Sequence, residues 1–430
     1  MFDREPEITV GILSAAELRF VLHGDFIDSL TGLPASGEQR FSWAVDFSER
    51  SFVPTSPEAF FELSGVVIGK AFHWEQAENQ HFRGTLRIIA EGERLTAVNV
   101  IGVEEYLQSV ISSEMSADSP PEALKAHAVI SRSWLLSQVL NREKKGDHAA
   151  FADAPREEDA EYIRWYDRQE HDRFDVCADD HCQRYQGITR IRSGQVARAI
   201  EATRGQVLTF GGAICDARYS KCCGGVTEAF ENVWEPVAHP YLRPVRDMIP
   251  PPALPDLSGE EAARRWIETT PAAFCHTADR ELLGTVLNRY DQQTPDFYRW
   301  QVEYTQAELS EWVKQRLGVD LGRIEALIPL ERSTAGRLIR LQIVGTRRTL
   351  TLGKELVIRR ALSPSHLYSA AFVVDTEMRG SEKVFRLKGA GWGHGVGLCQ
   401  IGAAVMGAHG YSYPEILSHY YPRAELTTIF

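Results

Sequence analysis

The chain has 430 residues, of which 43% are hydrophobic and 25% are charged. This length suffices for two or three domains, and the composition excludes wholesale disorder and fibrous repeats. Its 47 Lys and Arg residues against 59 Asp and Glu residues give a formal net charge of -12, which argues against nucleic acid as a partner because a phosphate backbone is bound by a basic surface.

The first residues are charged and lack the apolar stretch of a secretory signal. No later apolar run approaches the length that spans a membrane. The sequence therefore predicts either a cytoplasmic protein or one whose export signal lies outside this chain.

The N-terminal region alternates apolar and polar side chains. The alternation is clear over residues 8–12 and 18–22, and it returns over residues 86–89 and 95–100. A period of two is typical of strands with one face against a core. We therefore expect a β-rich lobe over residues 1–100.

A helical pattern begins directly after this lobe. Apolar residues recur on one helical face at Val103, Leu107, Val110 and Ile111. The next position of that face is Glu114, where the pattern calls for an apolar residue. A carboxyl held against an apolar face keeps its proton more readily, as a general acid must. The alternative left open is a glutamate at a solvated helix end.

Capping residues and Pro121 open a second helix, which we expect to run to about Leu140. Arg132 lies in this helix and could direct a fixed positive charge at a substrate oxygen or a carboxylate. The alternative is a solvated surface cation. Beyond the helix, residues 149–173 are highly charged and indicate a solvated helix or loop.

Residues 188–210 resemble strands, and residues 219–225 form a turn rich in small side chains. Three prolines at 250–252 mark a linker, after which residues 259–282 have a helical pattern. Strand alternation resumes over residues 337–352 and 385–388, and residues 400–410 again look helical. We therefore expect a mixed α+β, multi-lobed fold with a catalytic core over 101–250, an inserted α/β subdomain over 251–350, and a glycine-rich part over 351–430 that completes the core.

Seven cysteines, an odd number, cannot all pair within the chain. Cys177, His181 and Cys182, with His171 nearby, offer sulfur and nitrogen ligands that suit zinc. The spacing supplies three ligands from one short segment, so a fourth must come from elsewhere. The alternative is a cysteine-containing strand entry without metal.

Glycine occupies every second position from Gly389 to Gly397, with His394 inside the run. Such a segment lets a substrate approach the backbone closely. It does not fit a nucleotide-binding pattern, because Gln400 stands where the third glycine of G-x-G-x-x-G would be. A glycan or a peptide is the better expectation, and tight turns with a structural His394 are the alternative.

Several of these segments together resemble the stage II sporulation protein D and amidase-enhancer family. The resemblance runs in order through residues 103–115, 122–132, the Cys177 to Tyr185 block, residues 223–228 and residues 393–422. It implies a peptidoglycan lytic transglycosylase that acts on glycan strands stripped of their stem peptides, in the cell wall or periplasm. Glu114 matches the family's acid/base catalyst and Arg132 an arginine important for activity, while Cys177 and His181 match zinc-binding positions.

We assign substrate binding to the two loop segments of the resemblance, at Tyr219, Lys221, Gly224, Gly225, Thr227, Gly393, His394, Gly395 and Gln400. The chain departs from the family pattern at His127, where glutamine is usual, and at Cys399, where a small polar residue is common. Val226 stands near a position where some relatives carry a basic residue, so the identity of a second catalytic cation stays open.

Two other functions remain. An amidase enhancer would bind peptidoglycan and activate a cell-wall amidase without cleaving glycan itself. A glycoside hydrolase would need a second carboxylate opposite Glu114, for which Glu228 is the candidate.

Overall fold

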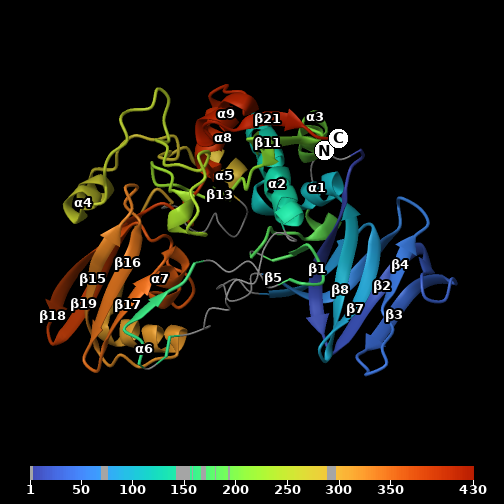
Figure 1. Ribbon diagram of the computed structural model, residues 1–430, viewed down its shortest axis with the longest axis horizontal. Helices are drawn as coiled ribbons and strands as arrows, with labels where there is room; N and C mark the ends of the chain where they lie inside the picture. Colours follow the sequence, from blue (N-terminus) through green and yellow to red (C-terminus); the bar gives the residue numbers. More distant parts are fainter. Residues whose placement is uncertain are drawn as a thin grey trace.

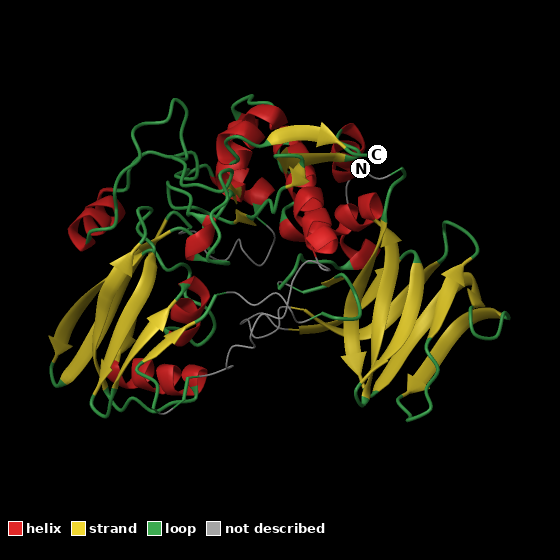
Figure 2. Ribbon diagram, in the orientation of Figure 1, coloured by secondary structure: helices red, strands yellow, loops and turns green. Residues whose placement is uncertain are grey.

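The computed structural model describes residues 3–68, 76–141, 155–156, 158–165, 171–179, 181–191, 194–287 and 297–430. Two β lobes lie at opposite ends of the molecule, and a helical region that carries both termini joins them (Figure 1). Figure 2 shows the same division by secondary structure. The expected mixed α+β, multi-lobed fold is confirmed. None of the described helices is both long and apolar enough to cross a membrane.

The N-terminal lobe is one nine-stranded sheet. Its path is β10-β1-β8-β7-β4-β2-β5-β6, with β3 paired to β2. The strands are β1 (Glu7–Ala15), β2 (Glu17–Asp28), β3 (Pro34–Ser42), β4 (Arg50–Pro54), β5 (Phe60–Ile68), β6 (Gln76–Phe82), β7 (Thr85–Glu91), β8 (Arg94–Gly102) and β10 (Val176–Cys177). The expected alternation is present, since Leu18, Phe20 and Leu22 of β2 are buried while Arg19 between them is exposed.

The helical region follows β8 without a loop. It contains α1 (Val103–Glu114), α2 (Pro121–Asn141), α3 (Gly194–Ala202), α8 (Gln400–Ala408) and α9 (Tyr413–Tyr420), with the short strands β11 (Gln206–Phe210), β12 (Ala213–Ile214), β13 (Tyr219–Ser220), β20 (Leu398–Cys399) and β21 (Glu425–Thr428). The predicted helices at 103, 121 and 400 are confirmed. Helix α1 ends at Glu114. This residue is therefore the last position on the apolar helical face from which the sequence singled it out.

The second lobe contains a three-stranded and a four-stranded sheet. Its elements are α4 (Glu260–Thr269), β14 (Arg299–Thr305), α6 (Gln306–Leu317), β15 (Ile324–Arg332), β16 (Leu338–Gly345), β17 (Thr349–Gly353), α7 (Glu355–Ala361), β18 (Phe372–Arg379), β19 (Glu382–Ala390) and β9 (Glu161–Ile163). Helix α5 (Arg280–Val286) lies between α4 and β14 in the chain but packs against α8 of the helical region (Figure 1). Strand β19 pairs with β14 over Val384 to Ala390, so residues on both sides of position 350 belong to this lobe.

Three segments differ from their predictions. Residues 194–202 form α3 rather than a strand, because Val196, Ala199 and Ile200 bury one helical face. The predicted helix over 259–282 is two helices, since Thr270 takes a left-handed conformation and Pro271 follows it. Within the charged segment 149–173, Glu161–Ile163 forms β9 and pairs with β17; residues 149–154, 157 and 166–170 lie outside the described residues.

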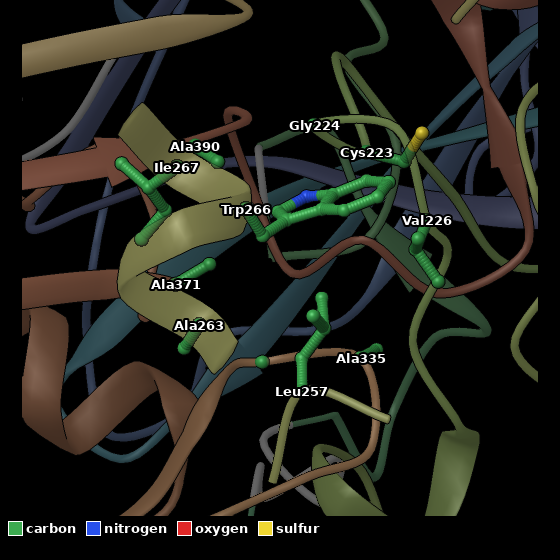
Figure 3. A pocket seen from close by; sticks show the side chains of 11 residues that line it. Cys223, Gly224, Val226, Leu257, Ala263, Trp266, Ile267, Ala335, Ala371 and Ala390 are labelled. Atoms are coloured by element: carbon green, nitrogen blue, oxygen red, sulfur yellow. The ribbon is translucent and has the colours of Figure 1, made fainter. Parts of the chain in front are cut away.

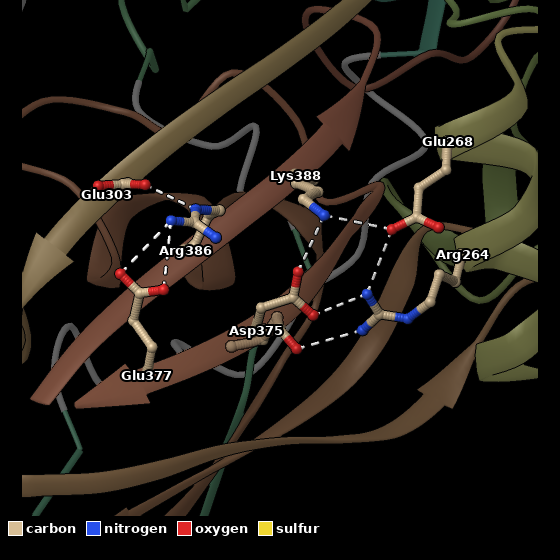
Figure 4. A network of polar contacts seen from close by, with 8 residues as sticks. Arg264, Glu268, Glu303, Asp375, Glu377, Arg386 and Lys388 are labelled. Carbon is tan, nitrogen blue, oxygen red and sulfur yellow. Dashed lines mark hydrogen bonds and ion pairs between the residues drawn. The ribbon is translucent and has the colours of Figure 1, made fainter. Parts of the chain in front are cut away.

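A network of charged side chains joins α4 to the strands β18 and β19 (Figure 4). Arg264 Nη1 lies 2.7 Å from Asp375 Oδ1, and Lys388 Nζ lies 3.1 Å from Asp375 Oδ2 and 3.3 Å from Glu268 Oε1. Pairs this exposed contribute about 0–1 kcal/mol each. The buried Ala263 and Ile267 on the inner face of α4 therefore supply most of its docking energy.

Candidate active site

Glu114 is half-buried at the C-terminal end of α1. Its Oε1 accepts a hydrogen bond of 3.1 Å from the backbone N–H of Arg184. Its backbone carbonyl accepts one of 3.2 Å from Lys221 Nζ. The carboxyl is thus held by a backbone donor, and a cation contacts the backbone of the same residue. This is a different environment from the solvated helix end that the sequence left open.

Lys221 reaches Glu114 because two short strands join the two loop segments expected to bind substrate. Strand β13 pairs in parallel with β20, setting Tyr219 beside Leu398 and Ser220 beside Cys399. Lys221 directly follows the first strand and Gln400 the second. The fold therefore brings Tyr219, Lys221 and Gln400 to the Glu114 end of α1.

Tyr219 belongs to a buried polar network next to Glu114. Its hydroxyl hydrogen bonds with Gln183 and Ser131, and Gln183 Oε1 accepts a hydrogen bond of 3.2 Å from the Tyr106 hydroxyl. Burial, followed by the negative charge of Glu114, raises the pKa of Tyr219 well above its ordinary value. Tyr219 therefore stays a neutral phenol.

His127 continues the network on α2. Its Nε2 lies 3.1 Å from Gln400 Nε2 and its Nδ1 lies 3.2 Å from Ser131 Oγ. An amide nitrogen only donates, so Nε2 accepts and the imidazole proton is on Nδ1. Burial and the nearby charge of Lys221 lower the pKa of His127 to about 3. The residue is a neutral link between α2 and α8.

Arg132 does not reach this site, contrary to the expected catalytic role. Its side chain has no exposed surface. Its Nε and Nη2 donate to Glu104 Oε1 and Oε2 at 2.8 and 2.6 Å, and Nη1 donates to the Gln206 carbonyl at 2.8 Å. Every terminal nitrogen is occupied inside the protein. This geometry assigns Arg132 a structural role, joining α1, α2 and β11.

The glycines of both loops pack against the protein's own chain. A Cβ on Gly224 would stand 2.9 Å from the backbone nitrogen of Gly391, and one on Gly395 would overlap the Arg337 guanidinium. Gly225 and Thr227 are buried as well. Neighbouring protein atoms thus fill the space that missing side chains leave at Gly224, Gly225 and Gly395, and substrate binding at these residues stays a prediction. Gly393 is half-buried and lies against Ser220.

His394 forms hydrogen bonds that hold the glycine-rich segment in its conformation. Its Nδ1 accepts a hydrogen bond of 3.0 Å from the Val396 N–H, and the ring also hydrogen bonds with the Tyr219 backbone. Burial and the Arg218 guanidinium lower its pKa well below the ordinary value. These contacts favour the structural alternative for His394.

Glu228 is fully buried, and both of its carboxylate oxygens have partners. Oε1 accepts from the Ala229 N–H and from Asn232 Nδ2, each at 2.8 Å. Oε2 accepts from Ser333 Oγ at 2.5 Å. Burial raises the pKa of this carboxyl. Glu228 therefore joins the second lobe to the core and is not placed to activate a water molecule.

A cluster of possible metal ligands lies shortly before Arg184 in the chain. The donor atoms of His171, Cys177, His181 and Cys182 all lie within 4.8 Å of one another. The Nε2 of His171 is buried without a hydrogen-bond partner among the described residues. A hydrogen bond from Cys182, together with His171 and His181, lowers the pKa of Cys177 to about 2. Two sulfurs and two nitrogens at this spacing fit a zinc ion.

Sequence reasoning did not single out Arg184, whose backbone N–H holds the Glu114 carboxyl. It follows Cys182, a member of the cluster of possible metal ligands, by two residues. No side-chain pattern could have marked Arg184, because its contact is made by the backbone.

A small apolar pocket lies elsewhere, between α4 and the Cys223 to Val226 segment (Figure 3). The Trp266 ring crosses it, and the Arg246 guanidinium stacks 4.5 Å from the centre of that ring. Glu114 is not among its lining residues. This pocket is a packing seam of the second lobe.

Two family models match parts of this chain. A family model described as "Stage II sporulation protein" matches residues 91–210, which contain Glu114 and the metal-ligand cluster. A model described as a domain of unknown function, DUF8618, matches residues 228–397. Over residues 91–210 the chain is therefore similar to the stage II sporulation protein family.

Individual relatives agree with this assignment. The chain is 25% identical to an uncharacterised protein of Brachyspira hyodysenteriae, over 79% of this chain and 70% of that protein. It is 23% identical to stage II sporulation protein D of Bacillus subtilis, over 77% and 76% of the two chains. It is also 25% identical to the amidase enhancer of Bacillus subtilis, over 75% of this chain and 40% of that protein.

Proposed function

We propose that this protein cleaves the glycan strands of bacterial peptidoglycan as a lytic transglycosylase, with Glu114 as its acid/base catalyst. The observation that carries the proposal is the half-buried Glu114 carboxyl, held by the Arg184 N–H at 3.1 Å beside Lys221. The match to the stage II sporulation protein model and the names of the sporulation and amidase-enhancer relatives support a role at the cell wall.

Glycosidic cleavage needs a proton on the leaving oxygen, and a carboxylic acid usually supplies it. In the proposed reaction Glu114 protonates the oxygen that links N-acetylmuramic acid to N-acetylglucosamine. Its carboxylate then accepts the proton of the muramic C6 hydroxyl as that oxygen closes on the anomeric carbon. The product has a 1,6-anhydro end, and no water is consumed.

One carboxyl suffices for this route because the substrate provides the nucleophile. Hydrolysis requires a second carboxylate near the sugar, and the candidate Glu228 is fully buried with both oxygens bonded. That burial favours the transglycosylase over the hydrolase.

Lys221 is our candidate for the second catalytic cation. Its Nζ lies 3.2 Å from the Glu114 carbonyl, and Val226, near the position expected for a basic residue, is an apolar core side chain. A fixed ammonium at this place would stabilise negative charge that develops on the substrate during bond cleavage.

We also propose that Cys177, His181 and Cys182, with His171, hold a structural zinc ion. The donor set and the unpartnered, buried Nε2 of His171 support this assignment. A zinc ion bound there would cross-link the short chain segment from His171 to Cys182. The segment that follows Cys182 then presents the Arg184 N–H to Glu114.

The similarity to an amidase enhancer supports a second candidate function, in which the protein binds peptidoglycan and activates a cell-wall amidase. Such a protein would bind glycan and stimulate the amidase without forming sugar products of its own.

Mass spectrometry of peptide-free glycan strands after incubation with the protein separates these functions. Anhydro-ended fragments support the transglycosylase, reducing ends support a hydrolase, and binding without products supports the activator. Glu114→Gln keeps the shape of the side chain but removes its transferable proton, so we expect cleavage to fall at least about 100-fold. Glu105→Gln is the matched control, because Glu105 lies on the same helix and is 35% exposed in a pair with Arg83.

A further inference from the structure

Cysteines from different parts of the chain meet in the buried core of the helical region. Cys223 lies in the loop after β13, Cys275 between α4 and α5, and Cys399 at the end of β20. Their sulfurs and a carboxylate oxygen of Asp247 all lie within 4.8 Å of one another, and all four residues are buried. Figure 3 shows the Cys223 sulfur directed away from the apolar pocket.

The spacing of the sulfurs fits ligands of one ion. Cys223 Sγ lies 3.7 Å from Cys275 Sγ. A disulfide requires about 2.05 Å, and none of the seven cysteines, all of which the structure describes, forms one. Two zinc–sulfur bonds of about 2.3 Å at a tetrahedral angle place their sulfurs about 3.8 Å apart. The observed separation therefore corresponds to two thiolates on a common metal.

Neighbouring groups donate hydrogen bonds to these side chains, as groups around a metal site commonly do to the metal ligands. The Cys223 N–H donates to Cys399 Sγ at 3.2 Å, and the Gly225 N–H donates to Cys223 Sγ at 3.4 Å. The Cys275 N–H donates to Asp247 Oδ2 at 2.7 Å, and the Tyr420 hydroxyl donates to Oδ1 at 2.5 Å. Each proposed ligand except Cys275 receives a hydrogen bond that orients it.

Three thiols and a carboxyl are buried together, and each can bind a cation when it loses its proton. We propose that Cys223, Cys275, Cys399 and Asp247 bind a structural zinc ion, separate from the one at Cys177. The thiol of Cys222 contacts Cys275 and Cys399 and is the alternative fourth ligand. Three sulfurs with one carboxylate oxygen form a closed donor set of the kind that structural zinc takes.

This ion supports the candidate active site. Lys221 directly precedes the Cys222–Cys223 pair, and Gln400 directly follows Cys399. The same ion would also bind Cys275, which lies in the segment between α4 and α5, and so connect that segment to these two loops. It therefore fixes the cation beside Glu114 and the partner of His127 relative to one another.

The test is the zinc content of the full chain, purified without chelator and measured by elemental analysis. Two equivalents are expected in the wild type. Cys275→Ala/Cys399→Ala should keep one, and Cys177→Ala/Cys182→Ala should keep the other. Cys215→Ala is the control, since Cys215 is buried outside both clusters and should leave two. Metal content does not depend on glycan cleavage, so this result is distinguishable from failure of the proposed activity.

Cobalt(II) reconstitution adds a direct view of the ligands. The Cys177→Ala/Cys182→Ala variant should still show intense sulfur-to-cobalt absorption, and the Cys275→Ala/Cys399→Ala change made in addition should abolish it. If that second pair fails to fold, Asp247→Asn replaces it, with zinc release to a chelator expected to quicken at least about 10-fold. Unchanged zinc content and release in these variants, or a Cys223–Cys275 disulfide found in unreduced peptides, would overturn the proposal.

Discussion

Replacing Arg132 with methionine removes one half of a buried ion pair and separates a structural from a catalytic role. The substitution keeps much of the apolar stem but loses the bonds to Glu104 at 2.8 and 2.6 Å and the bond to the Gln206 carbonyl at 2.8 Å. Glu104 is 5% exposed, and among the described residues its carboxylate would keep the Gly205 N–H at 3.2 Å as its one remaining partner.

Leaving one member of such a pair unpartnered costs about 3–5 kcal/mol of unfolding free energy. We expect this loss for Arg132→Met. Adding Glu104→Gln removes the stranded charge, so the double variant should be at least about 1 kcal/mol more stable than Arg132→Met alone. Arg83→Met is the control, because Arg83 is 48% exposed in a 3.6 Å pair and should cost less than about 1 kcal/mol.

Urea denaturation followed by circular dichroism measures these differences, and glycan cleavage is then assayed under conditions where each variant is folded. A structural role predicts near-normal turnover in the folded fraction. The reasoning fails if Arg132→Met unfolds at the wild-type urea concentration and yet loses cleavage about 100-fold, because that result would place the guanidinium in the reaction.

The remaining predictions concern the site itself. Lys221→Met should lower the rate of anhydro-sugar formation about 10- to 1,000-fold with little change in glycan binding, whereas unchanged turnover would exclude Lys221 as the second cation. The pKa of His127 is lowered to about 3, so between pH 6.5 and 3 the unfolded chain binds a proton that the folded chain does not, and the free energy of unfolding falls as the pH drops. Urea denaturation across this range should show a smaller fall in His127→Gln, with a difference from the wild type of up to roughly 4 kcal/mol in the free energy of unfolding. Cys177→Ala should remove one zinc equivalent, which elemental analysis measures. It should also slow glycan cleavage, measured by product formation, because the segment that holds Glu114 becomes less ordered.

Local patterns in the sequence were sufficient for most elements. The alternation around Phe20 and the 3.6-residue spacing from Val103 reflect burial of one face, which is a property of neighbouring residues. The same logic found Glu114, because a carboxyl on an apolar helical face breaks the local rule. Residues 194–202 were misread as a strand because short apolar runs fit both periods, and only packing against α1 and α2 selects the helix α3.

What the sequence by itself determined is the β-rich lobe, the helix pair with Glu114 at its turn, and the Cys177 to Cys182 ligand cluster, since each depends on residues close together in the chain. Tertiary structure alone decided that Arg132 faces Glu104, that Gly395 makes room for Arg337, and that Cys223, Cys275 and Cys399 share one site with Asp247. The physical reason is that the direction of a side chain and the partner it meets are set by packing between distant segments, and no local period encodes that packing.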